Sequence, residues 1–407
     1  MSSVPSAYIV AACRSACGKN KGALRNWHPV SLGAAVVNDL LRRVPSLDPS
    51  LVDDVILGCV SQVGEQGANI ARSVVLSSKL PIGVPGTTVD RQCGSSQQAI
   101  HFAAQAVMSG TQDIVIAGGV ECMTRQPIFS NMPKEFGKPN DDSIRAKFNT
   151  KVPFFSQFVG AEMMGAKYGI TRPEMDAFAA RSHARAFAAT QAGKFKKEIA
   201  VLKGHTKEGA EFDLTVDEGI RKDTSVEKLR GLDTLVKLGM SPPVQGGPVE
   251  GAITAGNASQ VSDGAAMLLI VNDNGLKKLG QGVRPLARIR SLALSATDPV
   301  LMLSGPISAS ELALKKAGLS LNDVGLYEVN EAFAVVPMAW SKQLKADEAR
   351  LNVNGGACAL GHPLGATGAK LMTTLVHEMV ATNTKYGLLS ICEGGGTANA
   401  TIVELMN

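Results

Sequence analysis

The sequence predicts an α/β protein made of two similar halves, with a segment of different character between them. Short apolar runs typical of buried strands alternate with helical patterns, and this alternation favours parallel sheet. Two regions share one plan, which indicates a duplication, whereas residues 124–252 do not follow it. The clearest strand runs are Val55–Val60, Asp113–Ala117, Ala266–Val271, Val324–Val329 and Gly387–Cys392.

The composition is that of a globular protein with more than one hydrophobic core. The chain has 407 residues, of which 45% are hydrophobic and 19% charged. This length predicts two or three domains. Its 42 glycines exceed the usual share of about 7% and predict tight turns and close backbone contacts, as in a large α/β enzyme.

Several functional classes are disfavoured. No stretch approaches the roughly 18 apolar residues of a membrane span, and the polar N-terminus does not resemble a secretory signal. Aromatic residues make up only 4% and no basic run interleaves with them, which argues against nucleic acid as a partner. The C-terminal Glu-Leu-Met-Asn is not a peroxisomal address.

The seven cysteines are odd in number and scattered, which predicts a reducing compartment without disulfides. Cys13 and Cys17 lie four residues apart, but no second ligand pair accompanies them, so the sequence predicts no metal site. We expect a cytoplasmic protein or one of an organelle matrix.

The duplication rests on two stretches with similar sequence and equal spacing. Asp54, in Ser-Leu-Val-Asp-Asp-Val-Ile-Leu-Gly, precedes Cys93 by 39 residues. Asp323, in Leu-Ser-Leu-Asn-Asp-Val-Gly-Leu-Tyr, precedes His362 by the same number. Each half would then bring one reactive side chain to a shared site.

The intervening segment is rich in Lys, Glu and Pro and contains a long helical pattern at Arg172–Lys197. It holds 20 Lys and Arg residues against 16 Asp and Glu, which fits either a solvated surface or a lobe that meets an anionic small molecule. We expect residues 1–123 with 253–277 to form the N-terminal half, 124–252 the inserted domain and 278–407 the C-terminal half.

Cys93 precedes a predicted helix. Apolar residues recur at helical spacing after it, and Gly110 is a natural stop. The amino end of a helix stabilises a thiolate, so a thiol with an ordinary pKa of about 8.5 could become a nucleophile with a nearby base. The alternative is a small buried hydrophobe. The helical positions are Ala99, Ile100, Ala103, Ala106 and Val107.

His362 lies between Gly361 and Pro363 in a glycine-rich loop. The loop is not a phosphate cradle, because Gly368 is followed by Ala and the dinucleotide fingerprint is absent. The two neighbours suit an imidazole held in one orientation, although a lone histidine is often structural.

Cys392 ends an apolar strand and is followed, after one residue, by Gly394–Gly396. The backbone N–H groups of these glycines could bind an oxyanion. The alternative is a sharp turn between two strands.

Together these motifs resemble the catalytic motifs of thiolases, over essentially the whole chain from Ile9 to Ile402. A further stretch, Thr254-Ala-Gly-Asn-Ala-Ser259 followed by Asp263-Gly-Ala-Ala, is similar to the family segment that touches the pantetheine arm of coenzyme A. The four catalytic motifs are Val89-Asp-Arg-Gln-Cys-Gly-Ser-Ser96, Asn330-Glu-Ala-Phe333, Gly361-His-Pro363 and Cys392-Glu-Gly-Gly-Gly396.

The resemblance implies a thiolase fold, with two duplicated mixed-sheet α/β halves packed as αβαβα layers and an inserted loop domain. It implies Cys93 as the nucleophile and His362 as the base that takes its proton and then holds the thioester oxygen. Asn330, through a water, would complete that oxyanion hole. Cys392 would be the second acid/base, and the N–H groups of Cys93 and Gly394 the second oxyanion hole.

The resemblance also implies a substrate, coenzyme A or an acyl-CoA, without a permanently bound cofactor. Ser259 is the best match for a pantetheine contact, with Met302, Ala332 and Phe333 as neighbours, and Arg221 matches a position near the adenine. A homodimer or homotetramer, and association with other β-oxidation enzymes, are further implications.

Two features favour a degradative 3-ketoacyl-CoA thiolase. Short-chain biosynthetic members carry a histidine in the covering loop, whereas Phe154–Glu162 has none, and Arg91-Gln-Cys93 is closer to degradative members. The alternatives are an acetoacetyl-CoA-forming thiolase, a related ketoacyl synthase, which lacks the second cysteine, and a non-catalytic acyl-CoA or sterol carrier.

Overall fold

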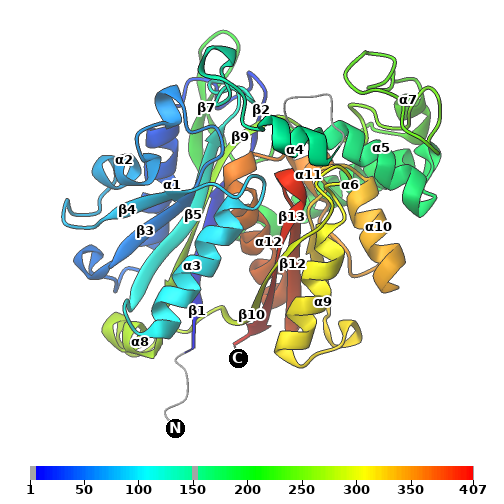
Figure 1. The fold of residues 1–407 in the computed structure, drawn as a ribbon. Coiled ribbons are helices and arrows are strands. Elements are labelled where there is room, and N and C mark those ends of the chain that lie inside the picture. Colours follow the sequence, from blue (N-terminus) through cyan, green and yellow to red (C-terminus); the bar gives the residue numbers. More distant parts are fainter. Residues whose placement is uncertain (1–5, 149–154, 407) are drawn as a thin grey trace.

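The apolar runs come together in one mixed sheet in the computed structural model, which describes residues 6–148 and 155–406 (Figure 1). The sheet follows the order β11-β12-β13-β10-β1-β9-β5-β3-β4, with β2 beside β9 and β6 beside β1. The strands are β1 (Tyr8–Ser15), β2 (Gly18–Lys19), β3 (Asp54–Gly58), β4 (Gly86–Val89), β5 (Ile114–Cys122), β6 (Ile199–Ala200), β9 (Ser262–Val271), β10 (Ala287–Ala296), β11 (Leu326–Val329), β12 (Tyr386–Cys392) and β13 (Thr397–Leu405). A separate hairpin joins β7 (Leu202–His205) to β8 (Glu211–Leu214).

The five predicted strand runs correspond to β3, β5, β9, β11 and β12. Their alternation with helices favoured parallel sheet, but parallel pairing is confined to β4-β3-β5, β11-β12 and the short β1-β6. The central strands β1, β9, β10 and β13 pair antiparallel. Of these, β9 is buried at every residue and largely apolar, so its sequence resembles that of a parallel strand, whereas β10 alternates buried residues with more exposed ones.

The duplication is visible in the strand order. The series β3-β5-β9-β1, which begins next to the edge strand β4, matches β11-β12-β13-β10, which begins at the opposite edge. The starts of β3 and α3 are 41 residues apart, and so are those of β11 and α12. The 39-residue spacing from sequence therefore found the repeat but misaligned it, and Cys93 and His362 are not equivalent positions.

The helices form three layers around the two halves of the sheet, which join only where β1 pairs with β10 at Tyr8 and Ile9. Figure 1 shows α3 and α12 between the halves, α1 and α2 on one outer face, and α9 and α10 on the other. The helices are α1 (Pro29–Arg43), α2 (Ile70–Ser77), α3 (Ser95–Ser109), α4 (Asp142–Lys147), α5 (Gln157–Tyr168), α6 (Arg172–Gln191), α7 (Val226–Arg230), α8 (Asp273–Leu279), α9 (Gly305–Ala317), α10 (Val335–Leu344), α11 (Ala357–Leu360) and α12 (Thr367–Thr382).

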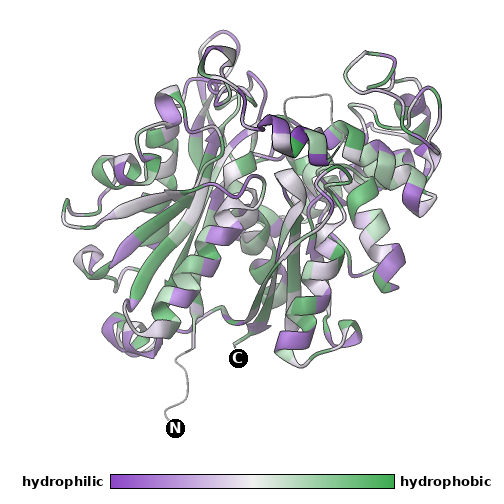
Figure 2. Ribbon diagram, viewed as in Figure 1, coloured by the Kyte–Doolittle hydropathy of each residue, from purple (hydrophilic) through white to green (hydrophobic). Residues whose placement is uncertain are grey.

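The hydrophobic core follows these layers. Figure 2 shows the strands mainly hydrophobic, whereas the outer helices carry hydrophilic residues on their free faces. The central cluster joins Ile100 and Ala103 of α3 with Met372 and Leu375 of α12 and with strands of both halves. This packing holds the amino-terminal ends of α3 and α12 near one another.

Glycines set the ends of two predicted helices. Gly110 has φ +77° and caps α3, as predicted. The helical pattern at Arg172–Lys197 is interrupted, because Gly193 adopts φ +71° and ends α6 at Gln191. Residues Lys194–Lys197 then form a 3-10 turn.

The inserted segment 124–252 carries α4 to α7 and β6 to β8 and is anchored to both halves. Its helices α5 and α6 pack on α10 and α11. Glu198 and Asp217 form ion pairs with Arg14 of β1. The three-part division of the chain stays a prediction, and Phe154 of the covering loop lies outside the described residues. Within those residues, no helix has the length and apolar character to cross a membrane.

Candidate active site

Cys93 lies in a strained loop between β4 and α3. Gln92 has φ +49°, a left-handed conformation that is unfavourable for a side chain, and Asp90 Oδ1 accepts its N–H at 2.7 Å. The loop turns the partly exposed Cys93 thiol toward a cavity. Gly94 caps α3, and a methyl group there would overlap with Glu393 Oε1.

The resting thiol differs from the stabilised thiolate expected at a helix end. Burial, followed by the charge of Glu393, raises the pKa of Cys93 to about 12. The first helical N–H groups are occupied, because Gly94 donates to Arg91 O and Ser95 to Gln92 O. The helix end therefore does not ionise Cys93, and attack requires a base that removes the proton.

His362 is fixed at its backbone by the start of β9. Its N–H is shared between Gln260 O at 3.1 Å and Ser262 Oγ at 3.2 Å. Gly361 precedes it with φ +85°, and a methyl group there would overlap with Ser262 Oγ. Glycine is therefore required for the loop to reach β9.

The imidazole of His362 adopts one tautomer. Its Nδ1 lies 2.6 Å from Thr367 Oγ1, and that hydroxyl donates its only hydrogen to Pro363 O at 2.9 Å. Nδ1 must then carry the proton, which leaves Nε2 as an acceptor, 3.4 Å from Asn330 Nδ2. Burial, then Lys370, lowers the pKa of His362 to about 3, so the ring is a neutral base at physiological pH.

Glu121 of β5 holds the His362 loop against the N-terminal half. Its carboxylate is fully buried and accepts hydrogen bonds from the N–H groups of Val60 and Gly365, both at 2.8 Å. A methyl group on Gly365 would lie 2.6 Å from Cys59 Cα. The strand ends of one half and the histidine loop of the other thus meet at backbone contact.

Cys392 ends β12 near Cys93. It is 1% exposed, and its pKa is raised well above the usual value by burial, the nearby Cys93 and Glu393. The glycines after it form a turn into β13, with Gly395 and Gly396 at positive φ. The strand-to-strand turn expected as an alternative is present, and it does not exclude oxyanion binding.

Glu393 lies between the two cysteines and the end of α3. Its Oε2 accepts from Thr397 Oγ1 at 2.7 Å, whereas Oε1, which lies against Gly94, has no partner. Burial raises the pKa of Glu393 to about 8. Below this pH the Glu393 carboxyl group is neutral, so it adds no negative charge next to the two thiols.

Two neighbouring cavities bring most of the predicted residues together. One, of about 100 Å³, is lined by Cys93, Met302 and Gly394. The other, of about 120 Å³, is lined by Ser259, Ala332, Phe333 and His362. The two share Ile128, Gln157 and Leu364 as lining residues.

The segments of the second cavity are held by backbone pairing. Ser259 N–H donates to Ala332 O at 2.9 Å, and Phe158 of α5 packs edge-on against Phe333 with centroids 6.1 Å apart. Arg221 lines neither cavity. It is exposed, and its backbone N–H donates to His183 Nδ1 at 3.1 Å.

The backbone N–H groups of Cys93 and Gly394 remain available, because neither donates to another residue in the described ranges. A larger cavity of about 750 Å³ lies beside α5 and α6 and includes none of the predicted residues. Its buried Glu162 already accepts from Ala252 and Ile253 N–H. Residues 6–148 and 155–406 contain no cluster of three or more acidic, His or Cys side chains that could hold a metal ion.

The sequence analysis missed four buried polar residues around the site. Two of them could have been found, because Glu121 in β5 and Lys370 in α12 are charged residues within largely apolar stretches. Glu393 lies within a quoted motif but received no role. Thr367 had no signal, because a threonine near glycines is common in turns.

A duplicated α/β fold with two cysteines and a neutral histidine at the junction of its halves is that of a cysteine-dependent acyltransferase. Family models for the thiolase N-terminal and C-terminal domains match residues 7–274 and 283–405. The chain belongs to the thiolase family.

Individual relatives cover nearly the full length. A steroid 3-ketoacyl-CoA thiolase of Mycobacterium tuberculosis is 48% identical over 402 residues, 98% of this chain and 94% of the relative. A 3-ketoacyl-CoA thiolase of Escherichia coli is 42% identical over 401 residues, 97% and 98% of the two chains. The acetyl-CoA acetyltransferase structure of Bacillus anthracis has a TM-score of 0.86, 34% identity and full coverage of both chains.

Proposed function

We propose that this thiolase cleaves 3-ketoacyl-CoA with coenzyme A, giving acetyl-CoA and a shortened acyl-CoA through an acyl group on Cys93. The observation that carries the proposal is the proximity of the Cys93 and Cys392 thiols, with His362 lining the neighbouring cavity and its Nε2 carrying no proton.

The first step makes the nucleophile. His362 Nε2 accepts the Cys93 proton, and the thiolate attacks the 3-keto carbon of the substrate. The resulting imidazolium and Asn330 Nδ2 lie near one another and can stabilise a developing negative oxygen. Because the Cys93 pKa is high, thiolate formation is coupled to attack rather than preceding it.

The second step breaks the carbon–carbon bond. The electron pair of the C2–C3 bond leaves as an acetyl-CoA enolate, which must receive a proton at its α-carbon. Cys392 is protonated in the resting site and supplies that proton. The N–H groups of Cys93 and Gly394 stabilise the enolate oxygen, a contribution typically worth about 3 kcal/mol per donor.

The third step transfers the acyl group. A second coenzyme A attacks the Cys93 thioester, its thiol proton passes to the Cys392 thiolate, and the shortened acyl-CoA leaves. The proton then returns from His362 to Cys93. The cavity with Ser259, Ala332 and Phe333 suits the pantetheine arm, and the one with Cys93 and Met302 suits the acyl chain.

A thiolysis assay with 3-ketoacyl-CoA substrates of increasing chain length tests the proposal. Wild-type protein should release acetyl-CoA, and Cys93→Ala should abolish turnover while circular dichroism stays unchanged. Residual thiolysis above about 1% in Cys93→Ala would refute the nucleophile, and no cleavage of any chain length by the wild type would refute the activity.

The biosynthetic direction is the second candidate, supported by the likeness to the Bacillus anthracis acetyl-CoA acetyltransferase. Condensation of two acetyl-CoA faster than cleavage of longer substrates would favour it. A carrier without catalysis would show neither reaction. The greater identity to 3-ketoacyl-CoA thiolases supports cleavage, and the steroid enzyme makes bulky substrates a useful addition to the assay.

The remaining expectations belong to the same proposal. The inserted segment 124–252 would cover coenzyme A, with Arg221 toward the adenine end. The enzyme would be a homodimer or homotetramer of the cytoplasm or an organelle matrix, working beside other β-oxidation enzymes. Light scattering would check the assembly, and a monomeric mass would contradict it.

A further inference from the structure

Lys370 is a buried cation behind the histidine loop. It lies on α12, one helical turn after Thr367, and is 2% exposed. Its Nζ donates to Gly361 O at 3.0 Å. A buried ammonium with so little solvent requires partners, and none of the catalytic steps above uses it.

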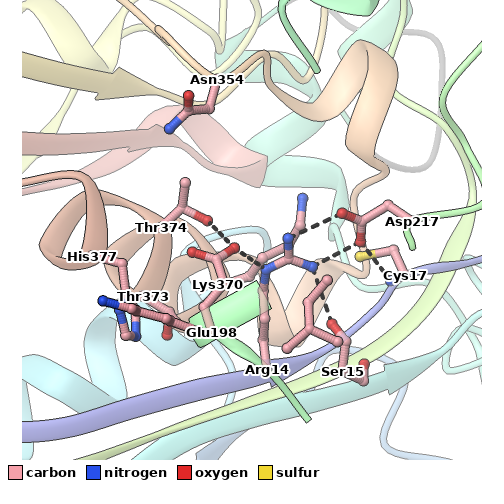
Figure 3. A network of polar contacts seen from close by, with 12 residues as sticks. Arg14, Ser15, Cys17, Glu198, Asp217, Asn354, Lys370, Thr373, Thr374 and His377 are labelled. Atoms are coloured by element: carbon pink, nitrogen blue, oxygen red, sulfur yellow. Dashed lines mark hydrogen bonds and ion pairs between the residues drawn. The ribbon is translucent and has the colours of Figure 1, made fainter. Parts of the chain in front are cut away.

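The surroundings of Lys370 form a buried ionic network. Arg14 pairs with Glu198 at 2.6 Å and with Asp217 at 2.7 Å, and all three are almost fully buried. Figure 3 shows Lys370 within this network. The Lys370 charge acts on Asp217 and also on the buried Glu328 and Glu331 near β11.

The network reaches the catalytic loop through α12. The Thr367 hydroxyl accepts a hydrogen bond from His362 Nδ1–H. The Lys370 ammonium donates one to the carbonyl of Gly361, the residue before His362. One helix therefore holds the loop at two points, on the ring and on the backbone. Gly361 itself has φ +85°.

We propose that Lys370 is a positioning residue for His362: it fixes the Gly361 carbonyl and places a buried positive charge behind the imidazole. The proposal rests on the proposed role of His362 as the base.

The electrostatic direction follows from the charge. The Lys370 ammonium opposes protonation of His362. It is the second cause, after burial, of the lowered His362 pKa. Removing the Lys370 charge should raise the His362 pKa.

The other titratable groups around Lys370 and the loop are Asp217 from the insert, Glu198 beside β6, Arg14 and Cys17 near β1, Glu328 and Glu331 near β11, Glu378 on α12, Glu121 and Cys59 near the Gly365 contact, Asp263 on β9, and Cys93.

The test follows the His362 ring by NMR in protein with 15N-labelled histidine. The chain has six histidines, and the resonance of His362 is the one missing in His362→Asn. Lys370→Gln removes the charge and keeps a hydrogen-bond donor, Lys370→Met removes both, and Lys370→Arg keeps the charge. The two charge-free variants ensure that a folding defect in one does not end the test.

We expect the His362 pKa to rise by about one unit or more in Lys370→Gln and Lys370→Met. The acid limb of kcat/KM should move upward by the same amount, whereas Lys370→Arg should keep the wild-type profile. An unchanged His362 titration in the charge-free variants would overturn the proposal, even if activity falls.

Thr374→Val is the matched control. Thr374 is buried on the same helix and donates to Glu198 Oε1 at 3.0 Å, so the variant disturbs the network one turn farther from the loop. It should leave the His362 titration unchanged. The NMR readout needs no turnover, so a wild type without thiolysis would refute the proposed function while this test still reports on Lys370.

Discussion

The Nδ1 atom of His362 and the hydroxyl of Thr367 lie 2.6 Å apart at the start of α12, and the hydroxyl is already a donor to Pro363 O. The imidazole must therefore donate at Nδ1 and accept at Nε2. A threonine, whose hydroxyl carries no charge, selects the tautomer without the imidazolium stabilisation that a carboxylate would add. This suits a base that must be neutral before each turnover.

Thr367→Val should lower kcat/KM about 10- to 100-fold. The variant leaves the Nδ1–H of a buried ring without its acceptor, which costs about 1–3 kcal/mol, and lets the ring change tautomer. The measurement is steady-state thiolysis together with thermal unfolding.

Thr373→Val is the control for that prediction. Thr373 is also buried on α12, and its hydroxyl donates to Ala369 O at 2.8 Å, but it does not touch His362. Its kcat/KM should stay within about twofold of wild type. Equal losses in both variants would contradict a specific role for Thr367.

Cys392→Ser should separate the half-reactions. A hydroxyl is a much weaker acid than a thiol, so the carbon–carbon step should slow by at least about 10²-fold, a typical contribution of a positioned acid or base. Acylation of Cys93 by a simple acyl-CoA should persist. Mass spectrometry of the intact protein would detect the acyl adduct, and normal overall thiolysis would argue against Cys392 as the acid.

Much of the architecture was predictable because it depends on local patterns. Apolar strand runs, the stop at Gly110 and the repeated plan were all readable, and each corresponds to an element of the structure. Strand direction was not readable for β9, because it is buried at every residue and lacks the polar alternation that marks an antiparallel strand.

The residues proposed to react were also marked in the sequence, since Cys93, His362 and Cys392 lie in distinctive glycine-rich motifs. The residues that set their protonation were not. Glu393 and Thr367 act through contacts with Gly94 and His362 that only the folded chain creates. The burial that raises the Cys93 pKa to about 12 was not readable either, because it depends on tertiary packing.

Glu393→Gln should change the pH dependence of Cys93. Below a pH of about 8 the carboxyl group is mostly neutral, and above it the new charge raises the pKa of both cysteines. Alkylation of Cys93 by iodoacetamide should match between wild type and variant at pH 7. At pH 9 the variant should react about threefold to tenfold faster, and identical rates at both pH values would exclude the effect.

The same carboxyl group predicts a stability effect. Its pKa is raised from 4.5 in the unfolded chain to about 8 in the folded protein, so its contribution is fully present below pH 4.5 and is lost as pH rises toward 8. The loss is on the order of a few kcal/mol. Glu393→Gln should therefore unfold at higher denaturant concentration than wild type at pH 8 but not at pH 5; the reverse pattern would contradict it.

Gly365→Ala should test the contact between the two halves. The new methyl group would lie 2.6 Å from Cys59 Cα and 2.8 Å from Gly58 O, and backbone at these points cannot yield without moving β3. Overpacking of this kind typically costs about 1–3 kcal/mol. The alternative is that the loop moves instead and carries His362 with it, and a displacement of about 1 Å can cost 10²-fold in rate. Denaturant unfolding and kcat/KM would distinguish the loss of stability from the displacement of His362.

Gly83→Ala is the control for Gly365→Ala. A methyl group at Gly83 meets nothing within 4 Å, so this variant should change neither stability nor kcat/KM. Wild-type stability and rate in Gly365→Ala would mean that the close approach of the halves does not position the histidine.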